Sequence, residues 1–501
     1  MRISSSSLCQ QVILPLVAVA ALGASAAADV QLIQAVKDGD SRAVRELLEH
    51  QADVNARQGD GATALHWAAH RNNPEIAELL IRAGALVNTT NDFGVTPLWV
   101  AATTGSASMV VKLLQAGGDP NLAPMTGGTP LMIAARQGNV AAVDSLLAHG
   151  GDANATEGAQ EQTALMWAVA QKRPAVVEIL LAAGADLNAR TKSSRRHVLL
   201  CCQKSLGRTE GAVWVEQGGF TPLMFAARHG AAKSAIHLLS AGASVDDTAA
   251  VGTTSLVVAA QHGWGAVASV LLENGANPDA VSAGYAALHW AALRGDSELV
   301  ATLLAYGANP DVQLAKGSTL KRDRRAFAFD KFLIGATPFS LAARRSDVDI
   351  MRLLAGEGAN TSLSLKDGRT AVMVAATGRT TGLRRLRLTE NQILETVTVG
   401  LDLGVDVNAV NQSGDTALHV AAANKFESVI RLLTKRGARL EARNTLGQTP
   451  LAVALAPPEA PQGAVGGAAL ARYREQYAEW KANKGHPPIA ELLRSLGATG
   501  E

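Results

Sequence analysis

Cysteine, aromatic residues and charge are all scarce in this chain of 501 residues. Three cysteines are too few for a disulfide-rich scaffold. Charged residues make up 18% of the chain and hydrophobic residues 48%, which excludes a disordered, highly charged protein and leaves enough apolar side chains for a core. The formal net charge of +2 is too small to attract nucleic acid over the whole surface, so we expect no specific nucleic-acid partner.

Short motifs that mark catalytic and cofactor sites are missing as well. The chain has no H-E-x-x-H, no C-x-x-C, no Walker phosphate loop and no G-x-S-x-G nucleophile elbow. Its histidines are scattered and lack the spacing of metal ligands. The adjacent Cys201 and Cys202 could form a disulfide only with strain. We therefore expect no enzyme activity, no cofactor and no metal site.

Residues 1–28 predict a secretory signal peptide. Arg2 precedes a polar run, an apolar stretch follows at 12–22, and small residues fill 24–28. These eleven residues are too few to span a bilayer, which needs about 20. We expect cleavage near Ala26 or Ala28 and a periplasmic or secreted mature chain without stable membrane insertion. A retained anchor and an ordinary apolar N-terminus are the alternatives.

A short segment of threonine, proline or another small residue, and leucine recurs along the rest of the chain. Its copies begin at Thr63, Thr96, Thr129, Thr163, Thr221, Thr254, Ala286, Thr337, Thr370, Thr416 and Thr449. Seven of the ten intervals lie within one residue of 33, and the other three are longer by 25, 18 and 13 residues. This spacing indicates a regular array of repeats with insertions.

Each repeat predicts a pair of helices. The threonine can cap the first helix, and proline suits its first position because no hydrogen bond is lost there. Paired alanines such as Ala101 and Ala102 let neighbouring helices approach closely. The second helix has apolar residues at i, i+3 and i+4, and it ends at a glycine such as Gly117, which suits a left-handed conformation. Aspartate and asparagine then favour a turn into the next repeat.

These residues resemble the ankyrin repeat, whose signature includes T-P-L-H-x-A. The best copies are Thr-Ala-Leu-His-Trp-Ala-Ala at 63–69 and Thr-Ala-Leu-His-Val-Ala-Ala at 416–422. The resemblance covers residues 29–500 and implies an all-α solenoid of about twelve helix-turn-helix repeats with hairpin-type fingers. The unit at 29–57 lacks the Thr-Pro-Leu segment, and its polar residues suit a capping repeat. His66, His289 and His419 occupy the histidine position of the repeat, where we expect a structural hydrogen bond.

Four insertions depart from the family pattern, at 191–218, 313–335, 378–390 and 457–486. The first three carry formal net charges of +3, +4 and +3. The first two interrupt a turn that projects toward the binding face in ankyrin proteins, so the resemblance implies two basic fingers on one side. The alternative is that they are solvated loops. The fourth predicts a helix at 468–483 whose Tyr473, Tyr477 and Trp480 either bind a partner or cover the end of the array.

Cations gather at the last turn of the predicted first helices. They are Arg136, Arg228, His229, His262, Arg294, Arg344 and Arg345. In the ankyrin family these positions face the concave side, so the resemblance implies a cationic binding surface. The basic insertions would add Arg195, Arg196, Arg324 and Arg325. The alternative is that cations stabilise the helix C-termini, by about 0.3–1 kcal/mol each.

We therefore expect a non-enzymatic protein–protein interaction scaffold that binds an acidic partner through its concave face and basic finger loops. A second hypothesis is binding of a polyanion such as an acidic envelope polymer, which steep salt dependence without discrete stoichiometry would favour. The aromatic residues Trp67, Trp167, Phe225 and Trp290 either anchor a partner or fill the space between neighbouring first helices.

Overall fold

The computed structural model describes residues 30–499 apart from 126, 200–211, 251, 283, 316–318, 322–326, 330–332, 379–387, 457–473, 475–476 and 479–487. The predicted signal peptide therefore lies outside the described residues. Contacts divide the chain into two compact units. The first comprises Met1–Lys192 and Gly219–Ala243, and the second comprises Ser193–Gly218 and Ser244–Glu501.

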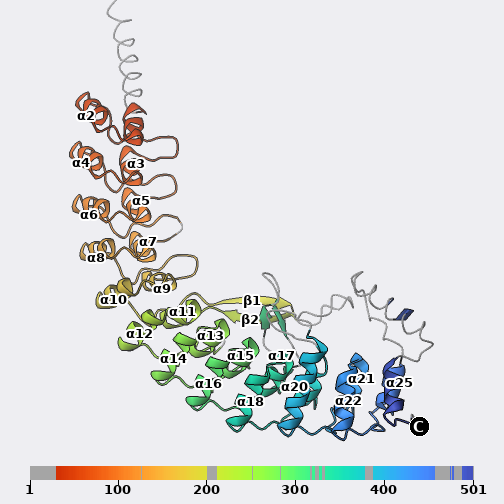
Figure 1. Cartoon of the computed structure of the whole chain (residues 1–501). Helices are drawn as coiled ribbons and strands as arrows, with labels where there is room; N and C mark the ends of the chain where they lie inside the picture. The colour runs from red at the N-terminus through yellow and green to blue at the C-terminus, as the bar shows by residue number, and fades with distance from the viewer. Residues whose placement is uncertain are drawn as a thin grey trace, which may run out of the picture. The chain divides into compact units, whose positions relative to one another are not determined.

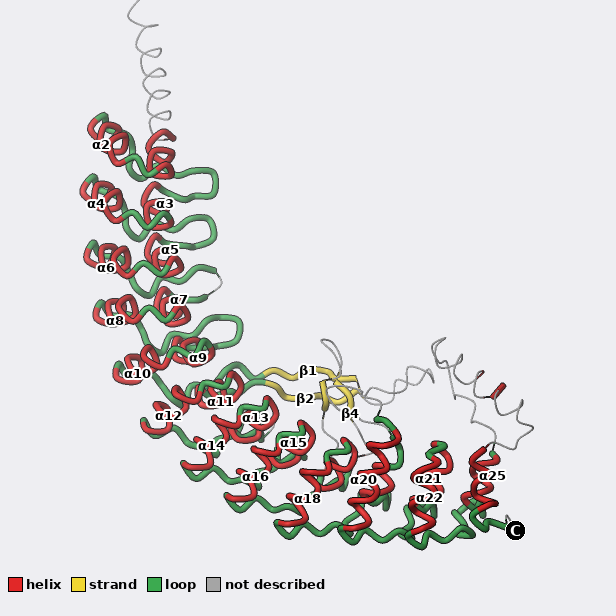
Figure 2. The backbone as a smooth tube through the Cα atoms, in the orientation of Figure 1, coloured by secondary structure: helices red, strands yellow, loops and turns green. Residues whose placement is uncertain are grey.

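Helix pairs build the first unit. In chain order they are residues 30–38 with α2 (Ser41–Glu49), α3 (Ala64–His70) with α4 (Pro74–Arg82), α5 (Pro97–Thr104) with α6 (Ala107–Gln115), α7 (Pro130–Gln137) with α8 (Val140–Ala148), α9 (Ala164–Ala170) with α10 (Pro174–Ala182), and α11 (Pro222–His229) with α12 (Ala232–Ser240). The first helices pack side by side in one layer and the second helices in another (Figure 1). The turns that precede α3, α5, α7 and α9 extend on the side of the first helices (Figure 2), and we call these turns and their equivalents in the second unit fingers.

The second unit repeats this arrangement. Its pairs are α13 (Ser255–His262) with α14 (Gly265–Glu273), α15 (Ala287–Arg294) with α16 (Ser297–Ala305), α17 (Pro338–Arg345) with α18 (Val348–Gly356), α19 (Ala371–Ala375) with α20 (Glu390–Asp402), α21 (Ala417–Asn424) with α22 (Glu427–Lys435), and α23 (Pro450–Leu455) with α25 (Pro488–Ser495). The two units together describe twelve pairs, which confirms the predicted all-α solenoid of about twelve repeats.

Caps at both ends define the first helices, as the sequence predicts. Thr96 Oγ1 accepts a hydrogen bond from the Trp99 amide at 3.1 Å, and Pro97 takes the first helical position. Gly105 ends the helix at φ 75°, a left-handed conformation that side chains disfavour. The core lies between the two helix layers, where paired alanines and the repeated leucine, such as Leu131, are buried.

Asparagine side chains join the turns that follow successive second helices. Asn121 Nδ2 donates to the Gly150 carbonyl at 2.9 Å, and its Oδ1 accepts from the Asp152 amide at 2.8 Å. In the second unit some of these positions are aspartates, which accept without donating, as when Asp279 Oδ1 accepts from the Asn309 amide at 2.8 Å. Asn408 in the same unit both donates and accepts, as Asn121 does. These turns are thus hydrogen-bonded to the next ones within their unit, so polar backbone groups of the turns are satisfied between repeats.

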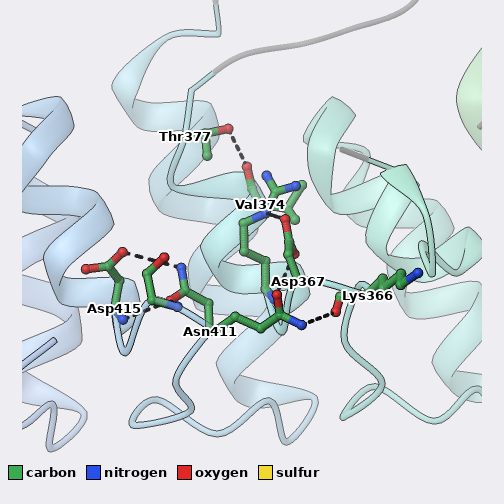
Figure 3. Close-up of polar contacts among 9 residues, drawn as sticks. Lys366, Asp367, Val374, Thr377, Asn411 and Asp415 are labelled. Carbon is green, nitrogen blue, oxygen red and sulfur yellow. Dashed lines mark hydrogen bonds and ion pairs between the residues drawn. The ribbon is translucent and has the colours of Figure 1, made fainter. Parts of the chain in front are cut away.

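Hydrogen bonds also fix the tips of the fingers and join neighbouring fingers to each other. Asn411 Oδ1 accepts from the amides of Ser413 and Asp415, each at 2.9 Å, which fixes the tip of its finger. Figure 3 shows Asn411 beside Asp415, and the neighbouring finger at Lys366 and Asp367. The backbone amide of Gln412 donates to the Asp367 carbonyl at 2.8 Å, so adjacent fingers are joined through their backbones.

Two of the predicted insertions contain antiparallel hairpins. Strands β1 (Ser194–Leu199) and β2 (Ala212–Gln217) lie in the first, and β3 (Thr319–Lys321) and β4 (Phe327–Phe329) lie in the second. Within the second unit β1 lies against β4 (Figure 2). The sequence analysis expects two fingers on one side, and the structure brings a strand of each insertion into contact.

The other two insertions are only partly described. The third separates α19 from α20, and its residues 379–387 lie outside the described residues. In the fourth, residues 474, 477 and 478 are helical, and Tyr477 is exposed. Tyr473 and Trp480 lie outside the described residues, so the predicted stripe stays a prediction.

Candidate binding surface

Two of the predicted surface cations in the first unit lie over aromatic rings. Arg136, in the last turn of α7, is exposed, and its Cζ lies 5.5 Å from the ring centroid of Trp167 in the next repeat. Arg228, in the last turn of α11, is also exposed, and its Cζ lies 5.8 Å from the ring of Phe220. Attraction between a cation and a ring face orients these guanidinium groups while leaving them accessible.

The neighbouring aromatic residues are largely packed. His229 stacks on Phe225, with ring centroids 5.9 Å apart and an angle of 16° between the planes. Phe225 and, in the second unit, Trp290 are buried, whereas Trp67 and Trp167 are half-buried. Packing is therefore the role that the structure shows for Phe225 and Trp290.

A third cation–ring pair was missed by the sequence analysis. Lys37 Nζ lies 4.3 Å from the ring centroid of Trp67 and donates to Gln58 Oε1 at 3.0 Å. Trp67 Nε1 donates to the same oxygen at 3.1 Å. The sequence analysis names Trp67 as a possible anchor for a partner. Lys37 belongs to the preceding repeat, and no sequence signal connects the two positions.

In the second unit two of the predicted cations, Arg294 and Arg345, donate hydrogen bonds to backbone carbonyls. Arg294 Nη1 donates to the Gln261 carbonyl at 3.4 Å, and Arg345 Nη1 donates to the Leu293 carbonyl at 2.8 Å. Both carbonyls belong to the end of the preceding first helix, where a cation is favourable. The guanidinium of Arg294 packs closely on Gly263, so a side chain at that position would require Arg294 to shift.

This arrangement corrects the grouping of the sequence analysis. Arg344 is only 8% exposed, so it is not part of an accessible surface. Arg294 and Arg345 are half-buried and bridge neighbouring repeats. In the structure Arg294 and Arg345 therefore stabilise helix ends, which is the alternative role given in the sequence analysis. His262 is exposed, and its Nδ1 lies 2.9 Å from the carbonyl of Val258 in its own helix.

Of the four arginines predicted in the basic insertions, the structure describes the side chain of one, Arg195. Arg195 on β1 is exposed, and its Nε forms an ion pair with Glu216 Oε1 on β2 at 3.0 Å. The register of the hairpin places these two residues directly opposite each other. Arg196 lies on β1, but its side chain is outside the described set, and Arg324 and Arg325 lie outside the described residues.

The repeated histidines are structural, as expected. His66 Nδ1 accepts from the Thr63 amide at 3.1 Å, and Nε2 lies 2.9 Å from the Val95 carbonyl of the next repeat. The amide must donate to Nδ1, so the neutral ring carries its proton on Nε2. His419 and His289 make the equivalent contacts. Burial lowers the pKa of His66, and it lowers the pKa of His289 to about 4.

Neither a metal centre nor a membrane-spanning helix occurs among the described residues. Within the ranges given above, no group of three or more histidine, cysteine, aspartate or glutamate side chains is placed to hold a metal ion. Among the helices of the same residues, none has the length and apolar character needed to cross a membrane.

Known proteins share the repeats. A family model described as ankyrin repeats (3 copies) matches residues 32–124, 106–191, 223–313 and 387–457, which is more than half of the chain. Human ankyrin repeat and SOCS box protein 16 is 31% identical over 222 residues, which are 40% of this chain and 47% of that protein. Human ankyrin repeat and KH domain-containing protein 1 is 35% identical over 116 residues, or 23% of this chain and 4% of that protein.

A channel protein is among the relatives as well. The transient receptor potential cation channel subfamily A member 1 homolog of Caenorhabditis elegans is 34% identical over 119 residues, which are 24% of this chain and 9% of that protein. The chain thus spans less than half the length of these relatives. Ankyrin repeats generally mediate protein–protein interaction and are typically non-enzymatic. The matched family model and the twelve helix pairs together show that this chain belongs to the ankyrin-repeat family.

Proposed function

We propose that the chain is a non-enzymatic scaffold that binds an acidic protein partner through cations at the ends of its first helices. The observation that carries this proposal is the placement of Arg136 and Arg228. Both are exposed on the same layer of the first unit, and both guanidinium groups lie over aromatic rings. Lys172, just after α9 in the repeat between them, adds a further exposed cation.

Pre-organisation is the physical reason to expect binding here. A guanidinium that already lies over a ring loses little conformational freedom when a carboxylate reaches it, so less of the interaction free energy is spent on ordering. Charges of one sign on an accessible face also speed encounter with a partner of the opposite sign. Arg294, Arg344 and Arg345 are left out of the proposed surface because they are half-buried or buried.

The basic insertions are proposed to add long-range attraction. The first three insertions carry +10 in total, while the remaining mature chain is acidic. Arg195, Arg196, Arg324 and Arg325 belong to this charge. A nearly neutral chain with its cations gathered in a few segments can attract an acidic surface locally, and salt weakens this attraction beyond about 8 Å at physiological ionic strength.

Charge reversal tests the surface. The partner is first isolated by affinity capture with the full mature chain from its native compartment. We expect Arg136→Glu with Arg228→Glu to slow association with that partner, and we expect the loss to shrink as salt rises. The matched control is Arg42→Glu with Lys233→Glu, which makes the same charge change at exposed positions on α2 and α12.

The controls decide between interpretations. Equal slowing in the control pair would mean that only the overall charge matters, and unchanged association in the first pair would refute the surface. Heparin serves as a probe for the polyanion hypothesis. Binding of heparin without a discrete stoichiometry, together with failure to capture a protein partner, would favour that hypothesis instead.

We also propose that the mature chain is exported. The support is the order of one cation, an apolar stretch at 12–22 and small residues at 24–28. N-terminal sequencing of native protein should give a start near Ala27 or Asp29. Recovery of the chain from the cytoplasm with Met1 intact would refute the proposed location.

A further inference from the structure

Two neighbouring fingers of the first unit present large apolar side chains to solvent. Phe93 lies at the tip of the finger that precedes α5, and Met125 lies at the tip of the finger that precedes α7. These residues are 65% and 87% exposed, respectively. Exposed turns are normally polar, as at Asp60 and Gln160 on other fingers of this unit. Adjacent exposed apolar residues mark an interaction surface when they are held together.

Hydrogen bonds hold the two tips in register. The Met125 amide donates to the Phe93 carbonyl at 3.2 Å, which places the two residues next to each other. Asn91 Oδ1 accepts from the Phe93 amide at 3.0 Å and so fixes the first tip. At the base of the second finger, Trp99 Nε1 donates to the Gly128 carbonyl at 2.9 Å. Because the finger backbones are already held in register, they need little further ordering when a segment binds.

The charges beside this pair are acidic. Asp92 precedes Phe93 and is exposed, and its amide donates to the Asp60 carbonyl of the preceding tip at 3.0 Å. The Asp60 carboxylate accepts two hydrogen bonds from its own finger, which lower its pKa and keep it ionised. The cation of that finger, Arg57, donates to the Thr90 carbonyl.

We propose that Phe93 and Met125 form a docking site for a protein segment that presents an apolar side chain beside a lysine or arginine. The apolar side chain would cover the pair, and the cation would meet the carboxylates of Asp60 and Asp92. The charge at the fingertips is thus opposite to that of the proposed cationic surface, so this site selects a segment of different chemistry and does not depend on the proposed function.

Three short synthetic peptides test the chemistry of this site on the full mature chain. One alternates leucine with lysine, one alternates leucine with glutamate, and one alternates serine with lysine. Binding is followed by fluorescence anisotropy of labelled peptide. We expect the leucine–lysine peptide to bind most tightly, because only this peptide matches both the apolar pair and the carboxylates. Tighter or equal binding of either other peptide, or no binding of the leucine–lysine peptide, would overturn the proposal.

Substitutions at the two fingertips test where the leucine–lysine peptide binds. Phe93→Ser with Met125→Ser should weaken binding of the leucine–lysine peptide at least about tenfold, as loss of interface anchors does. Met125→Gln alone, which keeps the finger backbone undisturbed, should weaken it less but measurably. The control Leu86→Ser removes an apolar side chain that is 62% exposed in a different turn of the same unit, and it should leave affinity unchanged.

Two outcomes would refute this assignment. One is unchanged affinity in both fingertip variants, and the other is an equal loss in Leu86→Ser. The variant Arg136→Glu with Arg228→Glu should keep its affinity for the leucine–lysine peptide. The affinity of this variant for the peptide therefore separates failure of the fingertip site from failure of the proposed cationic surface.

Discussion

Acidification should destabilise the repeats around His289. This side chain is completely buried. Its Nδ1 accepts from the Ala286 amide at 3.0 Å, and its Nε2 lies 3.3 Å from the Ala336 carbonyl. The neutral ring satisfies both contacts. Burial disfavours the charged ring and lowers the pKa of His289 to about 4, although the hydrogen bond to the Ala336 carbonyl favours the charged form. A second proton would also sit on Nδ1 and face the amide hydrogen.

The sign and size of the effect follow from this lowered pKa. Above the ordinary histidine pKa of about 6.5 both folded and unfolded chains are neutral here, and the full stability is present. As the pH falls below that value, His289 binds a proton in the unfolded chain but not in the folded chain. The free energy of unfolding then decreases by about 1.4 kcal/mol per pH unit until the pH approaches 4, which gives a loss of about 2 kcal/mol between pH 6.5 and pH 5.

Urea unfolding at a series of pH values tests this account. The variant His289→Gln cannot titrate, so its unfolding free energy should depend less steeply on pH than that of the natural chain, whatever its absolute stability. His149→Gln, at an exposed position, should keep the natural slope. Identical slopes in the natural chain and His289→Gln would refute the reasoning. Because repeat arrays can unfold in parts, each transition is fitted separately.

Two further predictions concern contacts between repeats. Leu131→Ala should lower the unfolding free energy by about 2–5 kcal/mol, because Leu131 is buried in α7, and a loss below about 0.5 kcal/mol in urea unfolding would mean that the helix faces are misassigned. Asn121→Ala removes two inter-repeat hydrogen bonds and should cost about 1–3 kcal/mol. Asn121→Asp keeps the acceptor and should cost less in the same measurement, and a larger cost would contradict the proposed bonding.

Local chemistry explains why most of the fold could be predicted from the sequence. The threonine cap, the proline that follows it and the left-handed glycine each act within one helix, so their spacing alone specifies the helix boundaries. Thr96, Pro97 and Gly105 take the roles that the repeat pattern assigns to them. The position of His66 in the pattern was likewise enough to predict a structural hydrogen bond.

Contacts between repeats explain why the site could be predicted only in part. Arg136 and Arg344 occupy equivalent positions in their helices, but Arg136 is exposed over a ring and Arg344 is only 8% exposed. Helix periodicity alone does not report this difference in burial. The exposed pair of Phe93 and Met125 also escaped sequence reasoning, because single apolar residues in turns carry no periodic signal.

The pairing of Arg136 with Trp167 is a contact of this kind, and it can be measured without a binding partner. The guanidinium lies 5.5 Å from the ring centroid, and a partly exposed cation–π contact contributes about 0.5–1 kcal/mol. A double-mutant cycle with Arg136→Ala and Trp167→Ala should therefore give a coupling of this size in the unfolding free energy. If the two substitutions are additive, the ring does not hold the guanidinium, and Arg136 is not pre-organised. Arg136 would then still attract an acidic partner, but ordering its side chain would cost free energy on binding.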